Sequence, residues 1–181
     1  MTTFLQHYRK TIIPAMQKEF GIANVMAVPK LEKVVINTGV GRLTKEQKIL
    51  ERIAGDIEKL SGQKPVFRMA KKSIASFKIR EGVPVGISVT LRGARMADFV
   101  NRFINIALPR SRDFQGIDPR NIDKFGNLNY GIKESSIFPE LNYENVKDIF
   151  GLQVTFVTTA GNREQGFALF KHLGFPLRKS K

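Results

Sequence analysis

Cysteine and tryptophan are absent from the 181 residues, and histidine occurs only twice, as His7 and His172. Without cysteine, the chain has no disulfide, no thiolate nucleophile and no cysteine-based zinc site. No run of eighteen apolar residues occurs, so we expect no membrane-spanning helix. The first ten residues are polar and lack the apolar centre of a signal peptide, so we expect no secretion.

Patterns typical of catalysis are also missing. No two acidic residues have a spacing typical of acid–base or metal chemistry, and no Gly-x-Ser-x-Gly sequence surrounds a serine. Gly39-Val40-Gly41 resembles the start of a dinucleotide-binding loop, but Thr44 stands where the third glycine is required. A tight turn is therefore favoured there. We predict a protein that is not an enzyme, with no cofactor, no metal site and no catalytic residue.

Positive charge dominates what remains. Thirty lysines and arginines oppose sixteen acidic residues, which gives a net charge of +14. Eleven of these cations lie between Lys64 and Arg112, where only Glu81 and Asp98 oppose them, so this segment alone carries +9. Domains this basic usually bind a polyanion. The concentration of charge favours a nucleic-acid-binding surface over a generally basic soluble protein.

The order of the expected elements indicates an α+β fold. Helix periodicity, capping residues and β-branched alternation predict the elements. They are a helix over 4–20 kinked at Pro14, a strand over 31–37, a helix from a Thr44-x-x-Gln47 capping box to Ser61-Gly62, a strand and basic loop over 66–80, a strand over 85–92, a helix over 96–106 that stops before Pro109, a strand over 152–158 and a helix over 163–173.

This order matches a split βαβ arrangement, an RRM-like or ferredoxin-like antiparallel sheet with helices packed on one face. We expect one domain over 1–181. It comprises an N-terminal helical part over 1–27, a core over 28–109 and 150–176, and an irregular excursion over 110–149, which is rich in Asp, Asn, Gly and Pro.

Alternation along two of the strands predicts one apolar face and one polar face. Val34 and Ile36 share the inward face of the first strand, while Lys33 and Asn37 point the other way. Val85, Ile87, Val89 and Leu91 alternate in the same way with Gly86, Ser88, Thr90 and Arg92. The polar sides could form a free, RNA-facing surface or an ordinary solvated sheet face.

The segment 71–80 combines cations, hydroxyl groups and the aromatic ring of Phe77, a mixture suited to phosphates and sugars. A solvated charged loop is the alternative, and the turn signal Glu81-Gly82-Val83-Pro84 after it favours a binding loop. The strands lack the aromatic pairs on which an RRM stacks splayed bases, so recognition of a folded RNA is favoured.

Several segments, in the same order, resemble the ribosomal protein L5 family, a large-subunit family that binds 5S rRNA. The resemblance covers essentially the whole chain, in the bacterial length class. It rests on residues 28–41, 61–65, 77–82, 89–93, 110–116, 138–140, 151–152 and 174–176.

The resemblance implies a cytoplasmic protein at the central protuberance of the large ribosomal subunit, with an open sheet face on 5S rRNA and further contacts to 23S rRNA. It also implies a basic loop that approaches P-site tRNA. It implies an intersubunit bridge to a small-subunit head protein, and we expect residues 110–116 to form the edge that makes this contact. Neighbouring central-protuberance proteins are implied as further partners. Carried onto this sequence, the rRNA-binding residues are Lys33, Asn37, Gln63, Lys64, Thr90 and Arg92, and the tRNA-facing loop residues are Lys71, Lys72, Lys78, Arg80 and Gly82.

The chain departs from the family pattern at three positions. Ser76 stands where glycine is common, Val83 where an aromatic residue is common, and Ser88 where lysine is common. The first two bear on the shape of the basic loop, and the third removes a cation from the strand. A nucleic-acid-acting enzyme or a free-standing RNA chaperone remains the alternative class, and co-sedimentation with large subunits at high salt separates these from a stable subunit component.

Overall fold

A computed structural model describes residues 4–41, 43, 46–112, 114–141 and 149–178. Arg42, Thr44 with its expected capping box, and Asp113 lie outside these ranges. The strands are β1 (Leu31–Gly39), β2 (Val66–Met69), β3 (Pro84–Leu91), β4 (Leu128–Ile132) and β5 (Leu152–Thr158). The α-helices are α1 (Phe4–His7), α2 (Ile13–Phe20), α3 (Gln47–Ser61), α4 (Gly93–Arg102), α5 (Leu108–Arg110) and α6 (Arg163–His172). Two π-helical segments, η1 (Tyr8–Ile12) and η4 (Phe103–Ala107), and the 3-10 turns η2 (Val25–Ala27), η3 (Ala75–Phe77), η5 (Pro119–Asn121) and η6 (Ser135–Ile137) complete the elements.

The strands form one sheet in the order β2-β3-β1-β5-β4. β2 and β3 are antiparallel, with Phe67 opposite Ile87. The order places β3 between β1 and β2, which are joined through α3, so the expected split βαβ arrangement is present. The predicted fold class, an α+β fold with an antiparallel sheet and helices packed on it, is confirmed.

The chain divides into two compact units, and the division falls within β1, β4 and β5. Unit 1 comprises residues 1–34, 92–130 and 155–181, and unit 2 comprises 35–91 and 131–154. Each unit is described by itself below.

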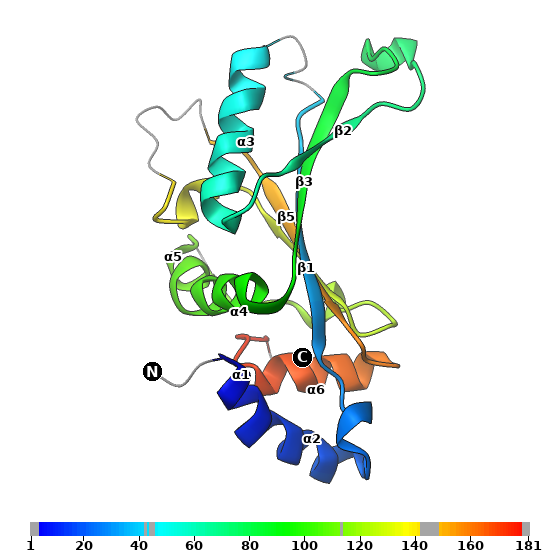
Figure 1. Ribbon diagram of the computed structural model, residues 1–181, viewed down its shortest axis with the longest axis vertical. Helices are drawn as coiled ribbons and strands as arrows, with labels where there is room; N and C mark the ends of the chain where they lie inside the picture. Colours follow the sequence, from blue (N-terminus) through cyan, green and yellow to red (C-terminus); the bar gives the residue numbers. More distant parts are fainter. Residues whose placement is uncertain (1–3, 42, 44–45, 113, 142–148, 179–181) are drawn as a thin grey trace. The chain divides into compact units, whose positions relative to one another are not determined.

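In unit 2, α3 packs against β3 and covers the apolar side of the strands (Figure 1). Ile53, Ile57 and Leu60 lie one helical turn apart on α3 and are buried, as are Ile87 and Leu91 of β3. Gly62 ends α3 with φ of 69°, the left-handed conformation that favours glycine, as its sequence position predicts. The β2–β3 hairpin continues to a tip formed by residues 70–83, which carries η3 (Figure 1).

In unit 1, α1 packs against α4 and α2 against α6. The core between these helices and the strands is aromatic, because phenylalanines from four separate segments meet there. Phe103 lies 5.2 Å from Phe156, and Phe175 lies 5.0 Å from Phe156 and 5.1 Å from Phe170, measured between ring centroids. Tilted and edge-on pairs of this kind add to the stabilisation from buried area.

The N-terminal helical stretch changes from a π-helical to an α-helical segment just before Pro14, and its backbone stays helical across this change. Pro14 lies in the first turn of α2, directly after η1. Because helical residues precede Pro14, its missing N–H removes one hydrogen bond from this stretch.

Pro109 was expected to end the fourth helix, and this prediction is wrong. The helical backbone continues through η4 and α5 to Arg110, with Pro109 in the first turn of α5. The π-helical segment also shifts the face of the helix. Ala107 is therefore buried, whereas Ile106, which the 3.6-residue period had placed inside, is 40% exposed.

The excursion over 110–149 contains a strand that the sequence pattern did not predict. β4 pairs with β5 at the sheet edge, and Thr155 Oγ1 donates a hydrogen bond to Asn129 Oδ1 at 2.8 Å. β5 itself spans Leu152–Thr158 as expected, with Leu152, Val154 and Phe156 buried.

Candidate nucleic-acid interface

Polar residues of unit 2 lie on β1, on β3 and in the segment directly after α3. The side chain of Asn37 is exposed and Thr90 is half-buried. Gln63 Nε2 donates a 2.8 Å hydrogen bond to the backbone carbonyl of Thr90, which holds the segment after α3 against β3. Lys64, next to Gln63, is exposed, and within the described ranges its ammonium group has no ion-pair partner. We name Asn37, Gln63, Lys64 and Thr90 the unit 2 polar patch.

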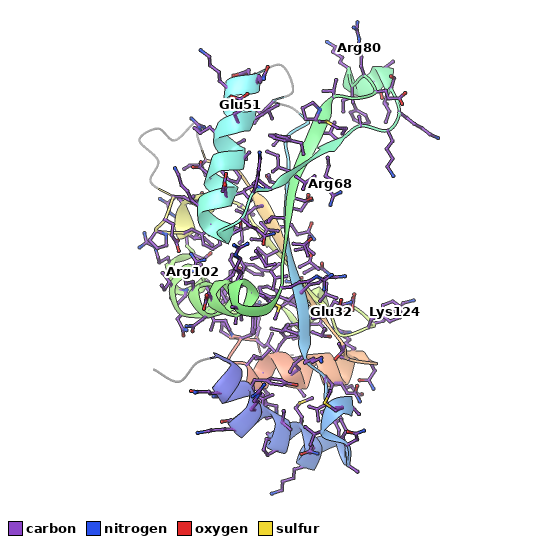
Figure 2. The ribbon with its side chains drawn as sticks, viewed as in Figure 1. Glu32, Glu51, Arg68, Arg80, Arg102 and Lys124 are labelled. Carbon is purple, nitrogen blue, oxygen red and sulfur yellow. The ribbon has the colours of Figure 1, made fainter. Side chains whose placement is uncertain are left out.

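Arg68 of β2 extends this surface along the hairpin (Figure 2). Its Nε donates a 2.7 Å hydrogen bond to Ser88 Oγ on β3, diagonally across the β2–β3 register. Ser88 was expected on a solvated face, but only 7% of it is exposed. The exposed residue is Arg68. The neighbouring strand thus supplies a cation beside Ser88.

In unit 1, Lys33 and Arg92 share one carboxylate. Arg92 Nη1 lies 3.2 Å from Glu32 Oε1, and Lys33 Nζ lies 3.7 Å from the same oxygen. The hydrogen bond from Arg92, followed by the charge of Lys33, lowers the pKa of Glu32. Arg92 directly precedes α4 and its side chain is 57% exposed. Because one carboxylate faces two cations, this cluster keeps an excess positive charge.

The loop over 70–83 in unit 2 is built by a small set of backbone contacts. Ile74 and Ile79 form a two-way bridge, and Gly82 N–H donates to the Ala70 carbonyl at 3.0 Å. Gly82 has φ of 80°, which favours glycine. Lys78 has φ of 54°, a conformation that L-residues adopt sparingly, and it is the single such non-glycine residue in the described ranges.

The loop presents its charge outward. Four of its cations are exposed, and among the described residues none of the four has an ion-pair partner; they are Lys71, Lys72, Lys78 and Arg80. Arg80 points away from the hairpin at its tip (Figure 2). Phe77 is 71% exposed beside them. The loop therefore offers phosphate-binding groups and one ring on a single projection.

These surfaces suit binding rather than catalysis or metal coordination. Ammonium, guanidinium, amide and hydroxyl groups bind phosphates and sugars. In the described part of the chain, no three metal-ligating side chains gather in one place, and no helix is long and apolar enough to cross a membrane. In the segment over 110–116, Arg110 and Arg112 are exposed.

Family comparisons identify the chain. Residues 24–80 match the ribosomal protein L5 family, and residues 84–177 match the C-terminal part of the ribosomal L5P family. The chain belongs to the ribosomal protein L5 family.

Curated relatives agree over nearly the full length. The large ribosomal subunit protein uL5 of Desulfatibacillum aliphaticivorans is 49% identical over 99% of this chain and 100% of its own length. The protein of the same name from Herpetosiphon aurantiacus is 52% identical, over 94% of this chain and 96% of its own length. That of Nitrosococcus oceani is 47% identical over 98% of both.

Family membership confirms several predictions. The protein is a structural constituent of the large ribosomal subunit and not an enzyme, and the expected RNA-binding and translation role fits the family. Its predicted location, the large subunit in the cytoplasm, is confirmed by the same relatives. The assignment of individual residues to 5S rRNA, tRNA and the bridge stays a prediction.

Sequence reasoning missed two residues that shape these surfaces. Arg68 was counted among the basic residues without a role, and the pairing of β2 with β3 brings it beside Ser88. Glu32 was given no role in the sequence analysis, yet it is exposed and accepts a hydrogen bond from Arg92. The signal for Glu32 was its charge, since an unpaired carboxylate on a buried face would be costly.

Proposed function

We propose that this protein binds 5S rRNA in the central protuberance of the large subunit through the unit 2 polar patch and the Lys33–Arg92 cluster. Arg68 is added to the residues that contact phosphate. Further contacts with 23S rRNA and with neighbouring proteins of the protuberance hold the complex in place.

The exposed, unsatisfied side chain of Asn37 is the observation that carries this proposal. Its neighbours in the sheet, Val34 and Ile36, are fully buried, so the position beside them is held rigidly. In the described ranges the Asn37 amide has no hydrogen-bond partner within the protein. An exposed amide on β1 and a hydroxyl on β3, with the exposed Lys64 in the same unit, support recognition of a polar, charged partner such as folded RNA.

Replacing Asn37 or Thr90 with alanine should weaken 5S rRNA binding while leaving the fold intact. Each side chain should contribute about 1–3 kcal/mol to binding, because its loss leaves an RNA group unpaired in the complex. Affinity is measured by filter binding at fixed salt, and stability by urea unfolding of the free protein.

Leu91→Ala is the matched control one residue further along β3. Leu91 is fully buried, so its truncation should cost about 2–4 kcal/mol of folding stability. If Asn37→Ala and Thr90→Ala destabilise the free protein as much as Leu91→Ala, the assignment of the polar face is wrong.

The loop over 70–83 is proposed to contact P-site tRNA, separately from the rRNA surface. Its cations exceed what a connection between two strands needs, and their exposure supports contact with a phosphate backbone. Lys78 lies in the left-handed conformation between η3 and the bridge residue Ile79, and these two neighbours fix the position of its backbone. Residues 110–116, with Arg110 and Arg112 exposed, are proposed as the edge that contacts the small-subunit head protein.

Replacing both Lys78 and Arg80 with alanine should weaken P-site tRNA retention about tenfold while 5S rRNA binding stays near normal. Two exposed phosphate contacts are lost, each contributing about 0.7 kcal/mol, and together these correspond to a tenfold change. The loss should be similar for different tRNA species, because phosphate contacts do not read sequence. Subunits reconstituted with the variant are tested for tRNA dissociation and for incorporation of the protein.

The double variant Lys48→Ala, Lys133→Ala removes two exposed cations of the same unit, one on α3 and one directly after β4, and serves as the control for charge alone. It should leave tRNA retention unchanged. Two results together would contradict the proposal: the loop variant is incorporated poorly into the subunit, and the subunits that do contain it bind tRNA with normal affinity. The loop would then belong to the rRNA surface.

A further inference from the structure

The turn over 123–127 in unit 1 displays an exposed aromatic ring beside a cation. Phe125 is 58% exposed, and Lys124 Nζ lies 5.0 Å from the centre of its ring. Lys124 points outward from the end of this turn (Figure 2). Neither residue belongs to the surfaces assigned above.

The turn is held rigidly by its own hydrogen bonds. Asp123 Oδ1 accepts from the backbone N–H of Phe125 at 2.9 Å and of Asn127 at 2.8 Å, and Asp123 Oδ2 accepts from the Asn127 side chain. Partial burial raises the pKa of Asp123, but hydrogen bonds from Asn127, Phe125 and Gly126 outweigh it and lower that pKa overall. The carboxylate is thus fully engaged and leaves the ring and the lysine as the presented groups.

The turn is also anchored to the sheet and to α6. Thr158 N–H donates to Asn127 Oδ1, and Thr158 Oγ1 donates to the Gly126 carbonyl, both at 2.9 Å. Gly126 packs directly on Gly166 of α6. A surface Phe held by so many contacts has little conformational freedom left to lose when it binds a partner.

A second cation lies near the same end of the sheet. The backbone of Lys30 is hydrogen-bonded to Thr159, the residue after Thr158, so β5 alone separates Lys30 from the turn. Two strand spacings amount to about 10 Å. Lys30 is exposed, as is Lys124. Lys30 and Lys124 are thus two exposed cations near the same end of the sheet as Phe125.

We propose that the 123–127 turn is a separate RNA-binding element, in which the Phe125 ring stacks on an unpaired nucleobase and Lys124 contacts a flanking phosphate. An aromatic face with cations beside it is the way in which proteins hold single-stranded or bulged nucleotides. Lys124 covers one side of the ring and leaves the other side for the base. This proposal rests on the proposed function only in one respect, namely that the protein binds RNA.

The absence of tryptophan from the chain permits a direct test. Phe125→Trp introduces a single tryptophan, whose fluorescence should be quenched when a nucleobase stacks on it. The full-length variant is titrated in separate arms with 5S rRNA, 23S rRNA and tRNA transcripts, so that the arm that quenches identifies the source of the base. Phe125→Ala should weaken binding of that same RNA by about 5- to 100-fold.

Met26→Trp is the matched control, because Met26 is also exposed in unit 1 but lies on η2, away from the turn. Its fluorescence should change little on addition of any of the three RNAs. Lys124→Ala should reduce the affinity for the RNA that quenches the tryptophan. It should also lower the slope of log affinity against log salt concentration by about one, as expected for the loss of one phosphate contact. The circular dichroism spectra of the variants should match that of the wild type, since Phe125 contributes little to the core.

Two results overturn the proposal. One is an unquenched Phe125→Trp in all three arms, with Phe125→Ala binding every RNA as the wild type does. The other is unchanged RNA affinity together with lost binding to a large-subunit protein, which would make the turn a protein contact. The proposed 5S rRNA function is judged separately by the affinity of the wild-type chain, so either proposal can fail while the other stands.

Discussion

Binding of the purified protein to 5S rRNA is expected to weaken by about a thousandfold or more as monovalent salt rises from about 50 to 200 mM. Each phosphate contact releases condensed counterions, and six to ten contacts give a loss of this size with the scaling established for duplexes. The exposed cations proposed to contact rRNA, among them Lys64, Arg68 and Arg92, support a number of contacts in this range. Equilibrium titrations at four or more salt concentrations measure the slope of affinity against salt on logarithmic axes.

Variants that each lack one cation show how much that residue contributes to the slope of affinity against salt. Lys64→Gln should lower its magnitude by about one, because one phosphate contact is lost. Lys171→Gln, which removes an exposed cation on α6 outside the proposed surfaces, should leave it unchanged. A nearly flat salt profile for the wild type would contradict the electrostatic interpretation of the +14 charge.

The sequence predicted the elements whose signal is local. β5 was predicted with its observed ends, because its alternation of apolar residues needs no knowledge of neighbouring strands. The inward faces of β1 and β3 followed in the same way, and with them the exposure of Asn37. The burial of Ser88 did not follow, because it depends on a hydrogen bond to a residue twenty positions away on another strand.

The elements that were missed depend on partners or on a local irregularity. β4, with the sequence Leu-Asn-Tyr-Gly-Ile, has neither clear alternation nor β-branched residues before its last position, and it forms a strand by pairing with β5. The helix that passes through Pro109 depends on the π-helical segment η4, which a fixed period of 3.6 residues does not describe. The pairing of Glu32 with Arg92 joins residues sixty positions apart, which strand alternation alone does not reveal.

Gly166→Ala is expected to destabilise the free protein by about 3 kcal/mol, among the largest effects of a single methyl group in this chain. A Cβ atom at position 166 would lie 2.5 Å from the Gly126 carbonyl oxygen and 2.8 Å from its carbonyl carbon. Both atoms are backbone and are held by Asp123 and Thr158, so the clash is relieved only if α6 or the turn shifts. Urea unfolding measures the loss.

Gly161→Ala is the control, since a Cβ there meets only the end of the Gln165 side chain, at 3.7 Å. Its stability should stay within about 0.5 kcal/mol of the wild type.

The same clash also bears on the RNA-binding turn, because a displaced Gly126 moves Phe125 with it. Phe125→Trp placed in the Gly166→Ala background should therefore show weaker quenching than Phe125→Trp alone, under conditions in which both variants remain folded. Wild-type stability of Gly166→Ala would mean that the turn and α6 are not packed as tightly as their glycines indicate, and the rigid display of Phe125 would lose its support.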